Sequence, residues 1–319
     1  MEAAAPSAGL RRTRHRLDRL GDTGLHLLTG GAALLALLII AAIIWKVIDG
    51  SWPAVRRCGI AFVWHTSWNP VTDVYGARWY VIGTLVTAFG AMLLAAPLAI
   101  AIGLFLTELA PQSIRGVIGS LVEMLAAVPS VVVGLWGILV LGPVMRADIE
   151  PFLHRYLGWI PIFGGSPSQS GMLVAIVVLT MMALPIISSI CRELFLSVPQ
   201  DVKEASIGLG ATRWEMVRSV IIPHVKGGII AGTILGLGRA LGEAIAVTQV
   251  VGNTIPLHLS LFGPGNTLAS AIASNYQGAG SNIEVAALVY LGLILLVITF
   301  VANLTAQRIV HRFETQRTR

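Results

Sequence analysis

The chain has 319 residues, of which 55% are hydrophobic and only 12% are charged. Soluble domains carry roughly twice that share of charged residues, so the composition excludes a water-soluble globular fold. The formal net charge of +6 does not indicate a nucleic-acid partner, because the basic residues gather beside apolar segments, as membrane topology requires.

Six apolar runs are long enough to cross a bilayer, which takes roughly 20 residues for a helix. They run approximately from Leu25 to Val47, Val81 to Leu106, Val117 to Leu141, Met172 to Ile190, Ile229 to Val251 and Val285 to Leu304. No run alternates with period two, which excludes barrel strands, and backbone in hydrocarbon must otherwise be helical. The sequence therefore predicts an all-α polytopic membrane protein with six transmembrane helices.

The N-terminal part differs from the rest of the chain. Residues 1–79 form a basic tail, one helix and an outer loop with Trp52, Trp64 and Trp68, which we expect to be anchors at the membrane interface. Residues 80–306 form a five-helix core, and residues 307–319 form a second basic tail. Because basic residues concentrate on the cytoplasmic side, both termini are expected to be cytoplasmic.

Two outer segments connect later spans. The segment from Met145 to Gly171 has an apolar stripe at helical spacing, which predicts a short helix lying on the membrane surface; the alternative is a contact for an outer partner. The stripe consists of Phe152, Leu153, Tyr156, Leu157 and Ile160. The segment from Gly252 to Asn282 is too polar to span and predicts a loop or a short re-entrant helix.

The loop from Ser197 to Pro223 contains signals for two short helices. Ser197 with Gln200, and Thr212 with Glu215, match the capping-box pattern. Gly208 and Gly210 lie between them, where a tight turn favours glycine, and Pro223 is expected to end the second helix. A solvated linker between two spans is the alternative.

The spacing in this loop resembles the EAA loop of importer permeases in the ATP-binding cassette (ABC) superfamily. The matching residues are Glu204, Ala205, Ser206, Gly210, Val220, Ile222 and Pro223. The resemblance implies a type I ABC importer permease (MetI-like) fold, with residues 201–209 as a coupling helix in a cleft of a separate ATPase. The candidate coupling residues are Asp201, Lys203, Glu204, Ala205, Ser206, Gly208, Leu209 and Gly210.

The chain has no G-x-x-x-x-G-K-[ST] stretch, so we expect no cofactor in this chain, with ATP and Mg²⁺ bound by the partner ATPase. No H-E-x-x-H motif or comparable pairing of nucleophile and base is present, which disfavours an intramembrane enzyme. We therefore expect no catalytic residue and no metal site.

Charged residues within spans mark a candidate site. Arg239 and Glu243 are four residues apart, which would place them on one face of the fifth span. Arg239 could offer its planar guanidinium to an oxyanion, with Glu243 limiting the grip; alternatively, the two neutralise each other and hold helices in register. Glu123 in the third span is a further intramembrane charge, or a group at a helix end.

Four stretches, residues 67–76, 126–137, 235–247 and 252–273, resemble the inorganic phosphate importer permeases of bacteria, and the first is most similar to their C-type subunit. The resemblance implies a second, A-type permease subunit, an ATPase dimer, an external phosphate-binding protein and the bacterial cytoplasmic (inner) membrane. It also implies that Arg239 and Glu243 lie in the phosphate path. Two alternatives stay open: an importer of another oxyanion, and a proton-coupled secondary anion carrier that uses these two residues as its switch.

Overall fold

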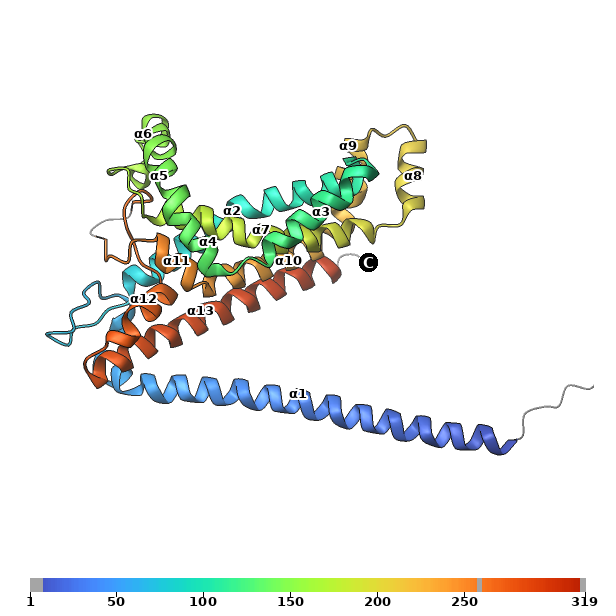
Figure 1. Cartoon of the computed structure of the whole chain (residues 1–319), viewed down its shortest axis with the longest axis horizontal. Helices are drawn as coiled ribbons and strands as arrows, with labels where there is room; N and C mark the ends of the chain where they lie inside the picture. The colour runs from blue at the N-terminus through green and yellow to red at the C-terminus, as the bar shows by residue number, and fades with distance from the viewer. Residues whose placement is uncertain (1–7, 257–259, 316–319) are drawn as a thin grey trace, which may run out of the picture. The chain divides into compact units, whose positions relative to one another are not determined.

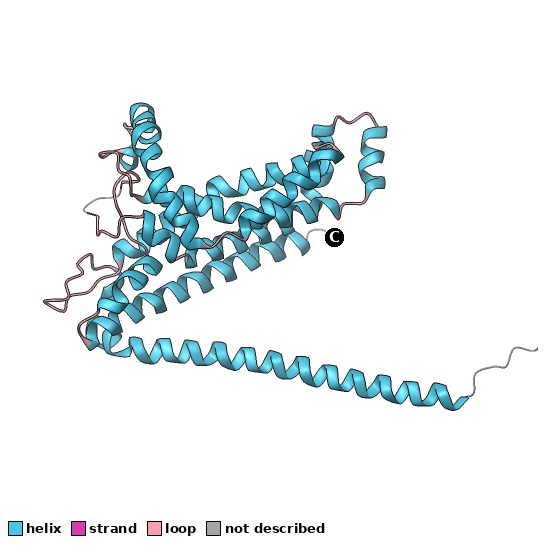
Figure 2. Cartoon of the chain, in the orientation of Figure 1, coloured by secondary structure: helices cyan, strands magenta, loops and turns pink. Residues whose placement is uncertain are grey.

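The computed structural model describes residues 8–256 and 260–315, and helices make up most of this part of the chain (Figure 2). The remaining residues of the expected tails and of the stretch 252–273 lie outside the described residues. The chain divides into two compact units, Met1–Gly50 and Ser51–Arg319. Helix α1 (Ala8–Cys58) begins in the first unit and ends in the second.

Six helices in the described residues are long and apolar enough to cross a membrane, which confirms the predicted number of spans. In the second unit, four long helices run side by side: α2 (Arg78–Leu104), α7 (Met172–Leu196), α10 (Ile222–Gly242) and α13 (Asn282–Thr315) (Figure 1). We call the end of this unit that carries α8 (Gln200–Gly208) and α9 (Arg213–Met216) the α8 end. The opposite end carries α6 (Glu150–Leu157), α11 (Ile245–Val250) and α12 (Leu268–Asn275).

The third span is not the single helix that we expected from Val117 to Leu141. Helix α3 (Gln112–Ala126) ends before Pro129, and a new helix begins at Ser130. Proline has no N–H to continue a helix and disfavours helical backbone at the residue before it. The crossing helix is instead residues 130–157. It joins α4 (Ser130–Trp136), α5 (Gly142–Val144) and α6 through the π-helical turns Gly137–Leu141 and Met145–Ile149.

Helix α6 continues this span, so the expectation of a separate helix lying on the membrane surface is wrong. The crossing helix has 28 residues, which at 1.5 Å per residue is about 42 Å long. The hydrocarbon core of a bilayer is only about 30 Å thick. The apolar stripe that includes Phe152 and Tyr156 therefore belongs to a span that is longer than the hydrocarbon core, at the end opposite α8.

Small residues allow α2 and α7 to pack closely. Ala91, Ala95 and Ala99 of α2 are fully buried, and a methyl group added at Gly103 would lie only 3.0 Å from Cβ of Cys191 on α7. Close backbone approach through small residues is the usual way in which membrane helices associate. This packing holds the ends of α2 and α7 next to each other at the α8 end.

The loop that follows α1 packs within the second unit. Phe62 stacks on Tyr290 of α13 with ring centroids 4.5 Å apart, and the Trp68 ring contacts the rings of Tyr75 and Tyr80. Trp64 is exposed, as expected for an interface anchor, whereas Trp68 is half-buried. The compact second unit begins at Ser51. The expected boundary between an N-terminal part, residues 1–79, and a five-helix core, residues 80–306, stays a prediction.

The segment from Gly252 to Asn282 contains the short helix α12, followed by a 3₁₀ turn over Tyr276–Gly278. Thr267 and Ser270 form a capping box at the start of α12, since each hydroxyl accepts a hydrogen bond from the backbone N–H of the other. Thr84 of α2 also accepts a hydrogen bond from the backbone N–H of Leu268 at 2.9 Å. These bonds fix the segment against the spans, at the end opposite α8.

Candidate functional site

The first part of the site is the loop between α7 and α10, where two short helices flank a turn. Thr212 and Glu215 form the expected capping box at the start of α9. Gly210 closes the turn with a φ of +91°, a conformation that glycine adopts without strain. Gly208, by contrast, is the last residue of α8 and is helical. The predicted pair of helices around a glycine turn is therefore present.

The second expected capping box, Ser197 with Gln200, does not form. Helix α7 extends to Leu196, so Ser197 ends that helix and donates its hydroxyl to the Leu194 carbonyl at 2.7 Å. Pro199 takes the N-cap position of α8, and the Gln200 side chain instead donates to Glu204 at 3.0 Å. The capping-box prediction failed here because helix α7 continues to Leu196, beyond the apolar run that ends at Ile190.

Pro223 does not end the second helix of the loop, which is a further correction. One helix runs from Arg213 to Gly242, so the fifth span begins well before Ile229. A π-helical turn over Val217–Ile221 precedes the proline, and the Ile222 N–H donates to the Val217 carbonyl. Such turns widen a helix locally and accommodate irregular residues. Helix α9 is thus continuous with the fifth span.

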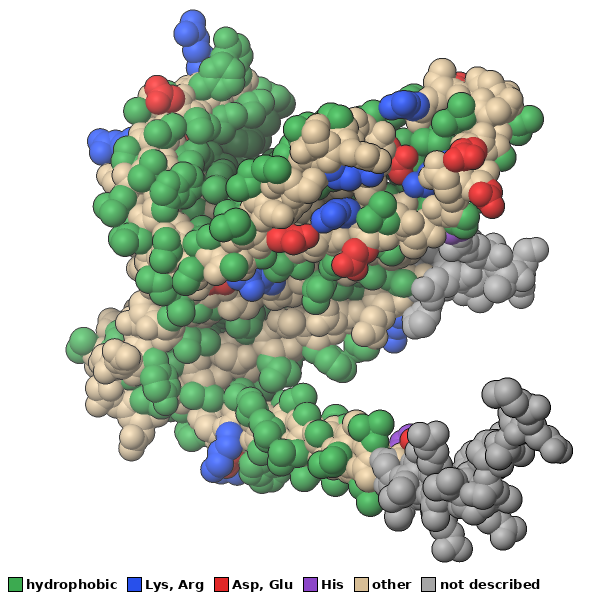
Figure 3. All heavy atoms as spheres, turned by 45° about the vertical axis from the view of Figure 1, so that its right-hand side comes forward, with side chains coloured by type: hydrophobic (Ala, Val, Ile, Leu, Met, Phe, Trp, Pro, Cys, Tyr) green, Lys and Arg blue, Asp and Glu red, His purple; other side chains and the backbone are tan. Residues whose placement is uncertain are grey.

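Helix α8 exposes most of its surface. Among its residues only Lys203 is buried, with 6% of its surface exposed. Leu209 in the turn is 91% exposed and Trp214 on α9 is also exposed. In Figure 3, charged side chains gather toward the α8 end on the right, whereas hydrophobic side chains cover much of the left-hand part, where a few charged side chains also stand. The candidate coupling residues other than Lys203 and Ser206 are exposed and accessible to a partner.

Lys203 points from α8 toward the spans. Its ammonium lies 2.6 Å from Oε1 of Glu108, in the π-helical turn Phe105–Leu109 that ends the second span. It also donates to the Phe195 carbonyl of α7 at 3.1 Å. Lys203 therefore does not belong to the exposed face. No local sequence pattern indicates Glu108 as its partner, because 95 residues separate the two.

The second part of the site lies where α10 ends. Helix α10 stops at Gly242, and Glu243 has extended backbone, so Arg239 and Glu243 do not share one helix face. Glycines at 238 and 242 weaken the helix here, since glycine is a poor helix former. The expected helical pairing is wrong: within the described residues, no carboxylate oxygen lies within 4.0 Å of Arg239.

Glu243 has a local partner instead. Its Oε1 accepts a hydrogen bond from the backbone N–H of Ala246 at 3.3 Å, in the first turn of α11. Glu243 lies one residue before the N-cap Ala244, and its carboxylate accepts from one of the first N–H groups of the helix, which have no partner within the helix. Glu243 thus helps to fix the start of α11 at Ile245, just after α10 ends at Gly242.

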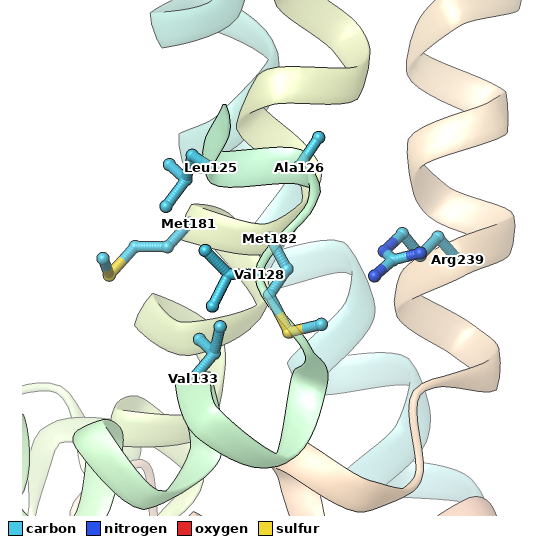
Figure 4. Close-up of a pocket in the computed structure, with 7 residues that line it drawn as sticks. All are labelled: Leu125, Ala126, Val128, Val133, Met181, Met182 and Arg239. Atoms are coloured by element: carbon cyan, nitrogen blue, oxygen red, sulfur yellow. The ribbon is translucent and has the colours of Figure 1, made fainter. Parts of the chain in front are cut away.

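Arg239 is exposed and lines a small cavity together with residues of α3, α4 and α7. Its guanidinium points toward Met182 of α7 and Val128, at the break between α3 and α4 (Figure 4). The cavity has a volume of about 10 Å³, which is enough for about one water molecule. An oxyanion such as phosphate does not fit in this cavity as it stands.

A larger cavity of about 520 Å³ lies between α2, α10 and α13. Its lining is apolar apart from Thr305 and includes Phe89, Ile234 and Val301. No cationic side chain lines it, and an anion without a positive or hydrogen-bonding partner is strongly disfavoured in an apolar cavity. The structure therefore favours Arg239, and not this cavity, as the candidate anion contact.

Glu123 lies on α3 and pairs with Arg192 near the end of α7, with Oε1 and Nη1 3.1 Å apart. The Glu123 side chain is 62% exposed. Exposed ion pairs contribute little to stability. The pair brings together two charges near the α8 end, as expected for groups at helix ends.

Comparison with known proteins identifies the family. A family model described as "Binding-protein-dependent transport system inner membrane component" matches residues 99–315. The phosphate transport system permease protein PstC of Pasteurella multocida is 40% identical over 312 residues, covering 95% of this chain and 97% of that protein. The protein of the same name from Haemophilus influenzae is 42% identical over 286 residues, covering 88% and 90%. PstC 2 of Mycobacterium tuberculosis is 38% identical over 288 residues, covering 88% of each chain.

Solved structures show the same fold. A chain of a bacterial ABC transporter involved in the import of the acidic polysaccharide alginate aligns with a TM-score of 0.53 at 18% identity, covering 91% of this chain and 99% of that one. A chain of the MetNI methionine ABC transporter aligns with a TM-score of 0.51 at 18% identity, covering 75% and 94%. The fold is that of an ABC importer permease. The chain belongs to the binding-protein-dependent transport system inner membrane components and, within them, to the PstC permease proteins.

Proposed function

We propose that this chain is the C-type permease subunit of an ATP-driven importer that carries inorganic phosphate across the bacterial cytoplasmic membrane. The observation that carries the proposal is the similarity to PstC proteins over nearly the whole chain. The exposed α8–α9 loop and an exposed arginine within a span supply the two contacts that such a subunit needs. No enzyme activity is assigned to the chain itself.

The partner at the α8 end is an ATPase, which binds ATP and Mg²⁺. Six accessible coupling residues, among them Leu209 with 91% of its surface exposed, present a surface to this partner, and the capping box of Thr212 with Glu215 keeps the second helix in place. A rigid helix joined to two spans can transmit a push into them, in contrast to a flexible linker. The α8 end, together with both termini, would then face the cytoplasm.

The phosphate path passes Arg239 at the surface of this chain. A permanently charged guanidinium binds oxyanions through paired N–H donors. The adjoining cavity of about 10 Å³ is too small to enclose an anion, so the rest of the path must come from another surface. We assign that surface to the second, A-type permease, with Glu243 fixing the start of α11 beside the path.

An external phosphate-binding protein delivers the anion at the end opposite α8. One of the structures with this fold is described as an alginate ABC transporter in complex with an alginate pentasaccharide-bound periplasmic protein. By analogy, α6, α12 and the loop after α1 would form the delivery side. An importer of another oxyanion would have the same parts, and only the similarity to PstC proteins favours phosphate.

Reconstitution of the four components into proteoliposomes tests the proposal. Radioactive phosphate should enter only when ATP and the phosphate-binding protein are both present, and sulfate should not compete. Uptake that persists without the ATPase and stops when the proton gradient is collapsed would instead establish a proton-coupled carrier. Purification of this chain in mild detergent should also yield the ATPase, and its isolation alone would contradict the importer.

A further inference from the structure

A buried contact joins α8 to the spans. Lys203 is the one residue of α8 whose side chain is buried, and it lies on the side opposite the accessible coupling residues. Its ammonium contacts two different spans at once: Glu108 at the end of the second span at 2.6 Å, and the Phe195 carbonyl of α7 at 3.1 Å. One side chain thus joins α8 to both.

The two connections of α8 are not equivalent. Helix α8 is covalently continuous with α7 through residues 197–199, so any displacement of α8 reaches α7 without a side-chain contact. The second span is distant in sequence, and in the part of the chain that the structure describes the ion pair of Lys203 with Glu108 is its polar contact with α8. Without this ion pair, a push on α8 would reach the second span only indirectly.

The environment of the pair makes the contact rigid. The side chains of Lys203 and Glu108 are only 8% and 14% exposed, so water screens them little. Buried ion pairs add little to net stability compared with apolar residues of similar size, and their best-supported role is to fix register between elements. Stability alone is therefore a weak reason for a charged pair here, while positional control is a sufficient one.

The segment that carries Glu108 is suited to movement. Glu108 lies in a π-helical turn at the end of the second span, where the regular α-helical bonding pattern is interrupted. One turn before it, Gly103 lets α2 approach Cys191 and Phe195 of α7 closely. A displacement applied at Glu108 would act on an irregular turn next to a closely packed pair of spans.

We infer that the ion pair between Lys203 and Glu108 is the link that transmits movement of the ATPase-docking helix α8 to the second span. Lys203 and Glu108 are positioning residues, since neither contacts the transported anion. The inference rests on the proposed function, because it assumes that an ATPase docks on α8. It predicts that breaking the pair separates ATP hydrolysis from transport while leaving the docked complex intact.

The experiment compares variants of the complete complex in proteoliposomes and measures both phosphate uptake and ATP hydrolysis. In Lys203→Met, whose side chain has a similar length and no charge, the phosphate transported per ATP should fall about 10-fold, within the roughly 5–150-fold range typical of coupling between sites. ATPase co-purification should be unchanged. Glu108→Gln should give a smaller loss, because the ammonium keeps an oxygen acceptor.

Three controls separate a coupling role from a structural one. Lys203→Arg retains a cation and should recover most of the coupling ratio. Glu123→Gln breaks the exposed pair with Arg192 at the same end and should leave the ratio unchanged. The double variant Lys203→Met with Glu108→Gln should be no worse than Lys203→Met alone, as expected for partners in one link.

The outcomes are distinguishable. An unchanged ratio of transport to hydrolysis in Lys203→Met, with the complex assembled, would overturn the inference and leave the proposed function in place. Loss of the ATPase from this variant would also overturn it, since the residue would then serve docking or folding. If the wild-type complex shows no ATP-dependent uptake, the proposed function itself fails before any variant is compared.

Discussion

Lys203 and Arg239 are both basic residues singled out by the sequence, yet the structure places them in opposite environments. Lys203 is buried and has a carboxylate 2.6 Å away. Arg239 is exposed, and among the described residues no carboxylate oxygen lies within 4.0 Å of it. A buried, paired cation is already committed to holding two elements together, whereas an exposed cation in a span is available to an anion from outside the chain. The comparison separates a positioning role from a binding role.

Substitution of Arg239 should have the largest effect. Arg239→Ala removes the only cation that we place in the path, and phosphate uptake should fall by about 100-fold, equal to about 2.8 kcal/mol, which is within the range for hydrogen bonds to charged groups. Uptake into proteoliposomes measures the effect, and co-purification of the complex measures assembly. Arg239→Lys should retain part of the uptake, because a point charge replaces the planar fork.

Loss of the complex in Arg239→Ala would show that the arginine pairs with a group on another chain to hold the subunits together. That result would remove the distinction between the two cations, since both would then serve structure.

Substitution of Gly210, in the turn after α8, should have the next largest effect, in this case on the affinity for the ATPase. Its φ of +91° is unfavourable for alanine, although no atom would block the added methyl group, so Gly210→Ala costs about 1–2 kcal/mol of backbone strain. Gly208 provides a matched control, because it is helical and also has open space around it. ATPase affinity should fall in Gly210→Ala and stay at the wild-type level in Gly208→Ala. Equal behaviour of the two variants would show that the geometry of the turn does not matter for docking.

Substitution of Glu243 tests whether phosphate transport needs the negative charge of the carboxylate or its hydrogen bond with the Ala246 N–H. Glu243→Ala removes the acceptor for the Ala246 N–H, and loss of an N-terminal cap costs about 1 kcal/mol, so uptake should fall about fivefold. Glu243→Gln keeps an oxygen acceptor and should stay within about twofold of the wild type, since amide oxygens also cap helices. Initial rates of uptake compare the two. An equal loss in both variants would assign the role to the negative charge.

The smallest effect is expected at Glu123. Its pair with Arg192 is exposed, and such pairs are worth only about 0–1 kcal/mol. Glu123→Gln should therefore leave thermal stability and phosphate uptake at wild-type values, as judged by thermal unfolding of the purified complex and by initial uptake rates. A strong loss of uptake would place a third charge in the path, alongside Arg239.

The spans were predictable because an apolar run of about 20 residues matches the thickness of a bilayer and is too long for a buried strand. The capping box at Thr212 and the turn at Gly210 were also predictable, since both depend on residues close together in the chain. Predictions failed where one element ran into another: α7 extended to Leu196 and took Ser197 as its C-cap, the helix that begins with α9 continued through Pro223, and α10 stopped before Glu243. Local patterns do not determine which of two neighbouring helices takes a boundary residue.

The ion pair between Lys203 and Glu108 could not be predicted from the sequence. Glu108 follows the end of an apolar run and Lys203 lies in the loop between two spans, and solvated charges are the usual interpretation at both places. Only the packing of the second span against α7 brings them together. The identity of the anion was equally inaccessible to physical reasoning, because an arginine in a span indicates an anion and not which one.

The most direct test of the proposed docking surface is site-specific photo-crosslinking from the α8 end. A photoreactive amino acid at the position of Leu209, which is 91% exposed, should form a crosslink with the ATPase in intact cells. The same amino acid at the position of Trp159, which is 81% exposed and lies beyond α6, should form none with the ATPase. A crosslink from position 159, or its absence from position 209 in an actively transporting complex, would contradict both the docking surface and the orientation of the chain.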